Sequence, residues 1–323
     1  MALQRNYQGG LHSTKRHLTP ASYRKKHEIF TQEAIMDFDA LIQDIQKNNW
    51  KVHGLELYEN DRLIHHYGNT TDGRFPIYSA TKTMVSIAAG IACDRGKFDL
   101  EKSVLTYLPS KIIHQMSESQ RTAYQAVTIE RLMTMSVDGY PFRPEGESYL
   151  QYSLSCPLPD VRTKVFHYTN ISAYLVGVAL TEALQEDLFQ FLNRNLFVPL
   201  HITEPVYQRC PDGYFYGASG MEMPVHDLSR VGMLLAHNGV YENERILSEK
   251  YVKTATGIRQ MNREGGYGYF IWKYRDGFRI SGKWGQRCYV LPERGLIISH
   301  LSHMEEDSHK LTESMERHLL GIG

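Results

Sequence analysis

The spacing of apolar residues divides the chain into two outer regions that predict strands and a central region that predicts helices. Near the N-terminus, apolar residues recur at helical spacing from Ile35 to Ile45, and strands are expected at 55–58 and 63–64 around a polar turn. From Ser79 to about Leu200 the spacing is helical. The C-terminal third returns to strands, which we expect at 267–273, 278–281, 286–291 and 296–301.

The end of the chain indicates how these strands are arranged. Asp276-Gly277 is a hairpin signal between two of them, and hairpins imply antiparallel pairing. Leu311, Met315 and Leu319 then recur every four residues, as on the core-facing side of a helix. The pattern predicts an α+β fold, in which an antiparallel sheet from the N- and C-terminal segments is flanked by helices and carries an inserted, mainly helical region. The boundaries we expect are a basic arm at 1–28, the sheet region at 29–82 and 215–323, and the helical region at 83–214.

The start of the central region carries candidate chemistry. The residues after Lys82 are apolar on almost every face, as in a helix that is buried all round. Side chains three apart lie on one helix face, so Lys82 can reach Ser79, and free N–H groups at the helix start can face a developing oxyanion. Ser79 and Lys82 can therefore form a self-activated serine nucleophile. A serine N-cap followed by a solvent-facing lysine has the same spacing.

Two further motifs follow in order, Tyr168-Thr169-Asn170 and Lys283-Trp284-Gly285. Together with Ser79-x-x-Lys82 they resemble the motif set of the serine β-lactamase and penicillin-binding protein family, in its class C-like branch with the related esterases. Segments from about Leu55 to Leu301 are similar to that family, including 94–100, 127–133 and 217–221. The resemblance implies the β-lactamase/transpeptidase-like fold, with the active site where the sheet and helical regions meet.

The resemblance also implies a role for each motif residue. Ser79 would attack an acyl carbonyl, and Lys82 and Tyr168 would share the proton that is moved. Asn170 would orient Lys82 and a substrate amide. The N–H of Gln286 would complete the oxyanion hole. On the residues alone, Lys82 needs a pKa lowered by burial or by a second cation such as Lys283, and the two ammonium groups would make the Tyr168 phenol more acidic.

The third motif is expected on an edge strand that lines the cleft. Gly285 there lets a substrate backbone approach closely. The family often has threonine where this chain has Trp284, and the loss of that hydroxyl argues against efficient recognition of a β-lactam carboxylate. Purely structural roles are also open: Tyr168 as a half-buried aromatic, Asn170 as a helix cap, and Lys283 with Trp284 as a strand lysine and its packing partner.

Composition narrows the alternatives. Lys and Arg number 36, as do Asp and Glu, so charge gives no case for nucleic acid as a partner. The four cysteines have no C-x-x-C spacing and are expected as reduced thiols, and the histidine spacing predicts no metal site. Without a signal peptide or membrane span in the sequence as given, we expect a cytoplasmic protein.

Two rival motifs fail on context. Residues 277–283 match a nucleotide-binding loop, but Trp284 follows and the segment predicts a hairpin. Residues 217–221 differ from a nucleophile elbow at Met221. The sequence therefore predicts a serine hydrolase that forms an acyl-enzyme on Ser79 without metal or cofactor and acts on a small ester or amide. A β-lactamase or D,D-peptidase is the alternative, and a slowly acylating or non-catalytic penicillin-binding sensor is an alternative of another class.

Overall fold

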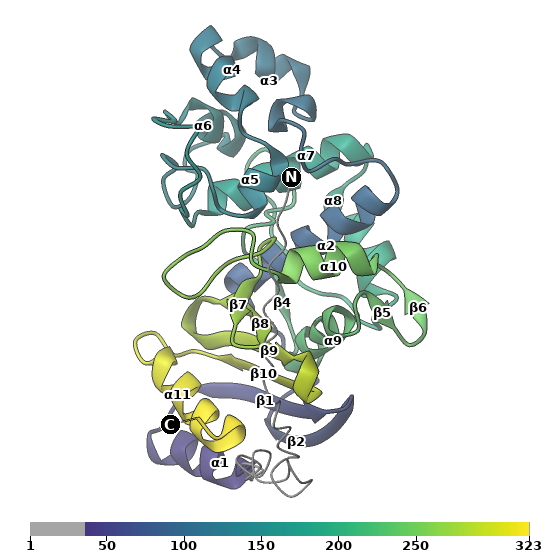
Figure 1. Ribbon diagram of the computed structural model, residues 1–323, viewed down its shortest axis with the longest axis vertical. Coiled ribbons are helices and arrows are strands. Elements are labelled where there is room, and N and C mark those ends of the chain that lie inside the picture. The colour runs from purple at the N-terminus through teal and green to yellow at the C-terminus, as the bar shows by residue number, and fades with distance from the viewer. Residues whose placement is uncertain (1–35, 323) are drawn as a thin grey trace, which may run out of the picture.

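A six-stranded sheet organises the molecule (Figure 1). The computed structural model describes residues 36–322, so the expected basic arm at 1–28 lies outside the described residues. The order across the sheet is β2-β1-β10-β9-β8-β7, and every neighbouring pair is antiparallel. Its strands are β1 (Val52–Glu59), β2 (Arg62–Gly68), β7 (Trp272–Tyr274), β8 (Gly277–Gly282), β9 (Gln286–Leu291) and β10 (Leu296–Ser302). The N-terminal β1 pairs with the C-terminal β10, which confirms the predicted sheet.

Helices cover both faces of this sheet. On one face, α1 (Phe38–Lys47) packs with α11 (Ser308–Leu320), and their apolar stripes enclose a small core with Leu55, Leu57 and Ile298. On the other face, α9 (Val225–Ala236) lies against β10, β9 and β1 and belongs to the larger core that continues into the helical region. Figure 1 shows α1 and α11 together at one end of the molecule and the helical region at the other.

The helical region is built around α2 (Thr81–Asp94) and α7 (Asn170–Leu184), which contact each other and are buried on nearly every side. The other α-helices of this region are α3 (Ser110–Gln115), α4 (Glu118–Gln125), α5 (Ile129–Met133), α6 (Tyr149–Ser155) and α8 (Leu188–Leu192). A later helix, α10 (Glu249–Thr256), contacts α2. Two-residue strands pair as β3 (Phe75–Pro76) with β4 (Glu222–Met223), and β5 (Val240–Tyr241) with β6 (Glu244–Arg245). The central helices thus bring the start of α2 and the start of α7 together.

The predicted strand at 267–273 is wrong in its first half. Regular pairing begins only at Trp272, because Phe270 has φ 57° and the preceding amides bond elsewhere. Tyr269 donates its N–H to Ala255 O, and Phe270 donates to Met133 O. This segment therefore joins the sheet to α5 and α10 instead of extending β7. The hairpin predicted at 277–283 is confirmed as β8 and its turn, with no helix following.

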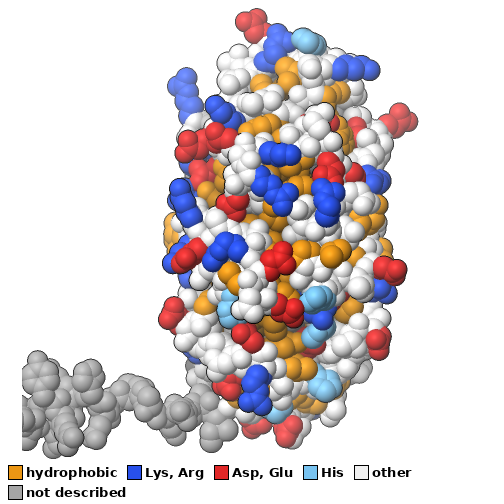
Figure 2. Space-filling model, turned by 90° about the vertical axis from the view of Figure 1, so that its right-hand side faces the viewer, with side chains coloured by type: hydrophobic (Ala, Val, Ile, Leu, Met, Phe, Trp, Pro, Cys, Tyr) orange, Lys and Arg blue, Asp and Glu red, His pale blue; other side chains and the backbone are white. Residues whose placement is uncertain are grey.

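Two findings concern the chemistry of the chain as a whole. All four cysteines are free thiols. Among residues 36–322, no helix is both long enough and apolar enough to cross a membrane. Figure 2 shows Lys and Arg side chains interspersed with Asp and Glu over one face of the molecule.

Candidate active site

Ser79 lies in a single 3-10 turn, Tyr78–Ala80, that continues directly into α2. The residue before it, Tyr78, has φ 47°, a left-handed conformation that is uncommon for a side chain with a Cβ. The turn is held from both sides. Ile77 donates its N–H to Met221 O at 3.0 Å. The Ile77 carbonyl lies so close to Gly282 that a Cβ on Gly282 would sit 2.2 Å from its oxygen.

Lys82 is completely buried, one turn after Ser79. Its Nζ lies 2.9 Å from Ser79 Oγ, 2.8 Å from Asn170 Oδ1 and 2.7 Å from Ala218 O. Burial lowers the pKa of the Lys82 ammonium from 10.5 to about 7, because the low-dielectric interior disfavours the charged form. Lys82 can therefore hold a neutral amine near neutral pH.

The three neighbours of Lys82 determine where that amine points. A carbonyl oxygen and an amide oxygen can only accept hydrogen bonds, whereas a serine hydroxyl can also donate one. A neutral amine has two N–H donors and one lone pair, so it donates to Asn170 Oδ1 and Ala218 O and accepts from the Ser79 hydroxyl. In this arrangement the lone pair of the neutral amine faces the proton of the Ser79 hydroxyl.

Tyr168 precedes α7 and lies beside the same pair. Lys82 Nζ is 5.1 Å from its ring centroid. Burial raises the pKa of the phenol to about 12, while the neighbouring Ser79 hydroxyl and the charge of Arg287 act in the opposite direction. The prediction of a more acidic phenol is therefore wrong: Tyr168 holds its proton at neutral pH.

The third motif is not on a strand. Residues 283–285 form the turn between β8 and β9, where Trp284 has φ 61°. Lys283 is exposed, and its Nζ lies 4.1 Å from the centroid of the Trp284 ring. Of the two causes expected to lower the pKa of Lys82, burial is the one that acts. Trp284 makes an edge contact with Tyr78, with centroids 5.1 Å apart, so the motif does reach the residue before the nucleophile.

The last two residues of the motif have defined surroundings. Gly285 has φ 87°, and a Cβ there would lie 2.4 Å from Ser302 Oγ. The Gln286 side chain is buried and is fully engaged: it donates to the carbonyls of Lys283 and Ser302 and accepts from Ser302 N–H. Its amide therefore fixes the turn onto β10, which leaves only the backbone of Gln286 for the oxyanion role expected of it.

Sequence reasoning missed three contributors. The carbonyl of Ala218 binds Lys82, and Arg287 supplies the positive charge beside Tyr168 that was assigned to Lys283. Tyr216 lies within hydrogen-bonding reach of Asn170. Ala218 acts through its backbone, which no residue type signals. Arg287 and Tyr216 lie close to the recognised motifs in sequence, but nothing in their spacing sets them apart.

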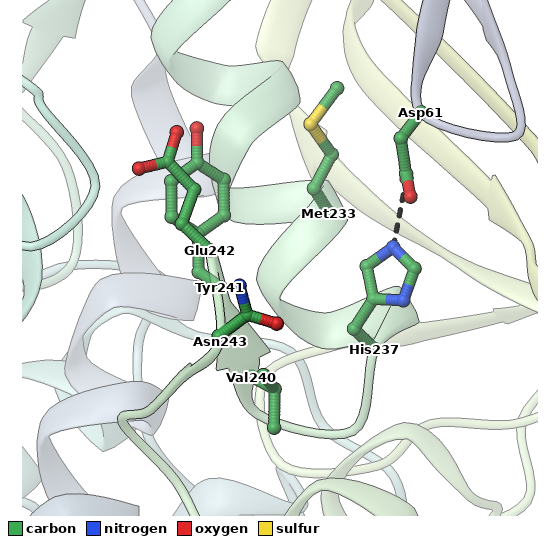
Figure 3. A pocket seen from close by; sticks show the side chains of 7 residues that line it. All are labelled: Asp61, Met233, His237, Val240, Tyr241, Glu242 and Asn243. Atoms are coloured by element: carbon green, nitrogen blue, oxygen red, sulfur yellow. Dashed lines mark hydrogen bonds and ion pairs between the residues drawn. The ribbon is translucent and has the colours of Figure 1, made fainter.

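A pocket lies apart from Ser79, Lys82 and Tyr168. It has a volume of about 510 Å³ and lies between the C-terminal end of α9, the β5–β6 hairpin and the β1–β2 turn (Figure 3). An Asp61–His237 contact of 2.8 Å closes one side, and Glu242 lies opposite. None of the motif residues lines it. Within the described part of the chain, no group of three or more His, Cys, Asp or Glu side chains is arranged to hold a metal ion.

Comparison with known proteins shows the family and the fold. The family model described as beta-lactamase matches residues 54–317, and the chain belongs to that family of serine hydrolases. A candidate 6-aminohexanoate-dimer hydrolase from Bacillus anthracis has a similar structure, with a TM-score of 0.71 at 18% identity over 87% of this chain and 82% of the other. A class C β-lactamase gives 0.69 at 17% identity over 88% and 94%. A penicillin-binding protein from Bacillus halodurans gives 0.64 at 15% identity over 85% and 99%.

Proposed function

We propose that the protein hydrolyses a small ester or amide through an acyl-enzyme on Ser79. The observation that carries the proposal is the contact of 2.9 Å between Lys82 Nζ and Ser79 Oγ, made by a lysine whose burial lowers its pKa to about 7. A base with that pKa is half deprotonated near neutral pH and can take the serine proton as the hydroxyl attacks. The contact therefore supplies the general base that a serine nucleophile needs.

The remaining steps follow from the groups around Ser79. The bond from Oγ to the carbonyl carbon forms, and the Ser79 proton passes to Lys82. The N–H groups of Ser79 and Gln286 face the oxyanion. Tyr168 gives its phenol proton to the leaving oxygen or nitrogen as that bond breaks, and regains a proton from the Lys82 ammonium. Water then cleaves the ester to Ser79 by the same groups in reverse order.

The surroundings of Trp284 favour an ester or amide over a β-lactam. An indole replaces the hydroxyl that would contact a β-lactam carboxylate, and the Lys283 ammonium rests over that indole at 4.1 Å from its centroid. A β-lactamase or D,D-peptidase activity is the second candidate, and its support is membership of the beta-lactamase family. A slowly acylating sensor would form the same adduct without turnover.

Substitution of Ser79 tests the proposal. An active-site serine probe should add one mass equivalent to the wild type and none to Ser79→Ala, and hydrolysis of the best substrate among p-nitrophenyl esters, nitrocefin and D-amino-acid amides should fall by several orders of magnitude. Ser219→Ala is the matched control, since Ser219 belongs to the rival G-x-S motif and should be dispensable. Wild-type turnover by Ser79→Ala would refute the assignment, and adduct without turnover in the wild type would favour the sensor.

A further inference from the structure

A pocket of about 810 Å³ begins one aromatic ring away from Tyr168. The Trp272 ring packs against Tyr168, with centroids 5.5 Å apart, and also lines this pocket. The ring centroids of Phe166 and Trp272 lie 5.8 Å apart, and Phe166 also lines this pocket. Trp272 therefore lies between Tyr168 and the pocket, and contacts both.

The floor and the rim of the pocket differ in chemistry. Phe166, Trp272, Val165 and Met261 supply apolar surface, and the last two are 48% and 62% exposed although both are large apolar residues. Because all four line one pocket, they form a shared apolar surface, and contiguous apolar surface of this kind marks ligand-binding grooves. The rim carries the exposed cations Lys164 and Arg263, for which residues 36–322 provide no ion pair.

The acidic residue of the rim is already neutralised. Glu264 pairs with Arg279, which in turn lies over the Trp272 ring at 5.6 Å from its centroid. The pocket therefore has a net positive rim, and the Glu264–Arg279 pair joins its loop to β8. Asn262 Oδ1 adds rigidity by accepting from the N–H groups of Glu264 and Gly266, at 2.9 and 3.0 Å.

We infer that this pocket binds the leaving group of the substrate, and that the leaving group has an apolar body and a terminal carboxylate. The inference rests on the proposed function, because the proton donor Tyr168 must lie beside the departing atom and Tyr168 adjoins the pocket. The apolar floor accepts an aryl or alkyl body. Lys164 and Arg263 attract the carboxylate at its far end.

Esters with one acyl group and three leaving groups test the inference. The 3-(carboxymethyl)phenyl, 3-(carbamoylmethyl)phenyl and 3-(aminomethyl)phenyl butanoates differ in charge, and a methylene separates that charge from the reacting oxygen. At low salt, kcat/KM should be about fivefold higher for the carboxylate than for the neutral amide, and lowest for the amine, as expected for exposed charge pairs. The preference should shrink in 0.5 M NaCl, because salt screens exposed charges.

Two double variants assign the effect to the rim. Lys164→Gln with Arg263→Gln should reduce the carboxylate preference to less than twofold, chiefly by lowering kcat/KM for the carboxylate ester. Lys47→Gln with Lys102→Gln makes the same change in net charge on exposed residues that do not line the pocket, and should keep the preference. A preference that is absent in the wild type, or that survives in the rim variant, would overturn the inference.

Two further measurements separate this inference from the proposed function. A carboxylate placed on the acyl side, as in p-nitrophenyl glutarate against p-nitrophenyl butanoate, should give no gain that depends on the rim. A rim-dependent gain there would overturn the assignment to the leaving group. Turnover with a Ser79 adduct but without charge preference overturns the pocket alone, whereas loss of both turnover and adduct overturns the proposed function and this inference with it.

Discussion

Lys82 shows how a buried cation becomes a base. A lysine side chain in the interior is tolerated here because three oxygen atoms surround its nitrogen. The same burial lowers its pKa to about 7. Asn170 and Ala218 bind the two N–H groups of the neutral form and leave the lone pair for Ser79. The same residues thus both hold the side chain and direct its reactivity.

The pH dependence of acylation should report this group. The neutral amine is the active form, and its fraction falls below the pKa of Lys82, so kcat/KM should drop about tenfold per pH unit below pH 6 and level off above about 8. Lys82→Arg should remove acylation at all pH values, since a guanidinium stays protonated. Stopped-flow measurement with a chromogenic ester would check both. A flat profile from pH 5 to 8 would exclude Lys82 as the titrating base.

The Tyr168 phenol predicts a difference between substrates. Because its pKa is raised to about 12, it acts as a proton donor and not as the resting base. Tyr168→Phe should therefore slow hydrolysis of an anilide or alkyl amide by roughly 100-fold or more, but slow a p-nitrophenyl ester much less, since that leaving group departs without a proton. Rates for both substrates in wild type and variant give the comparison. Equal losses would argue that Tyr168 only supports the position of Ser79.

At the scale of elements, the site depends on two strained turns in contact. Tyr78, before the nucleophile, and Trp284, in the β8–β9 turn, both have positive φ, and their rings meet edge to face. A β-branched residue is strongly disfavoured in that conformation. Restoring the family's threonine at position 284 would therefore strain the turn as well as add a hydroxyl. Trp284 lies also 4.5 Å from His303, so it anchors the turn on the end of β10.

Gly282 is the element-scale test of this arrangement. A Cβ at this position would lie 2.2 Å from the carbonyl oxygen of Ile77, two residues before Ser79. Because that oxygen belongs to the backbone, it cannot move aside as a flexible side chain could. Gly282→Ala should shift the nucleophile turn and lower kcat about 100-fold or more. Gly177→Ala is the matched control, since its nearest neighbour would be 3.6 Å away inside α7, and it should keep activity and stabilise the helix. Full activity in Gly282→Ala would show that β8 does not hold the turn.

The sequence predicted elements better than it predicted turns. The strands 286–291 and 296–301 and the start of α2 follow from apolar runs, and Ser79, Lys82, Tyr168 and Asn170 do come together as the motifs implied. The positions that were wrong depend on backbone conformation. The third motif became a turn through positive φ at 284 and 285, and β7 was shortened by positive φ at Phe270. Such conformations at Trp and Phe have no signature in residue type.

At the scale of the whole molecule, the sheet joins segments that are far apart in the described part of the chain. β1, early in the sequence, pairs with β10, near its end, and α1 packs on α11 beside them. The proposed catalytic residues lie away from α1 and α11, where α2 and α7 begin. The sheet therefore places β8 and its turn beside Ser79. A change that loosens the attachment of β1 to the sheet should lower activity only by lowering the stability of the fold.

Glu56 provides a test of that separation. Its carboxylate, on β1, is completely buried and accepts hydrogen bonds from Tyr58 Oη at 3.1 Å and from Ser229 Oγ, on α9, at 2.7 Å; His226 Nδ1 lies 3.1 Å away. Glu56→Ala would remove this acceptor from the Tyr58 and Ser229 hydroxyls, which would keep His226 Nδ1 at 2.9 Å and Val225 O at 3.2 Å as partners. Each lost hydrogen bond to the buried carboxylate costs about 1.5–3 kcal/mol.

We therefore expect Glu56→Ala to lower the free energy of unfolding by about 3 kcal/mol or more, and Glu56→Gln to lower it less, because the amide oxygen still accepts. Urea unfolding of both variants measures the difference. The activity of the folded fraction, normalised by the amount of Ser79 adduct, should stay within about twofold of the wild type, since no contact of Glu56 reaches Ser79 or Lys82 in the described structure. A large loss of normalised activity with unchanged stability would instead mean that the β1–α9 contact positions the active site directly.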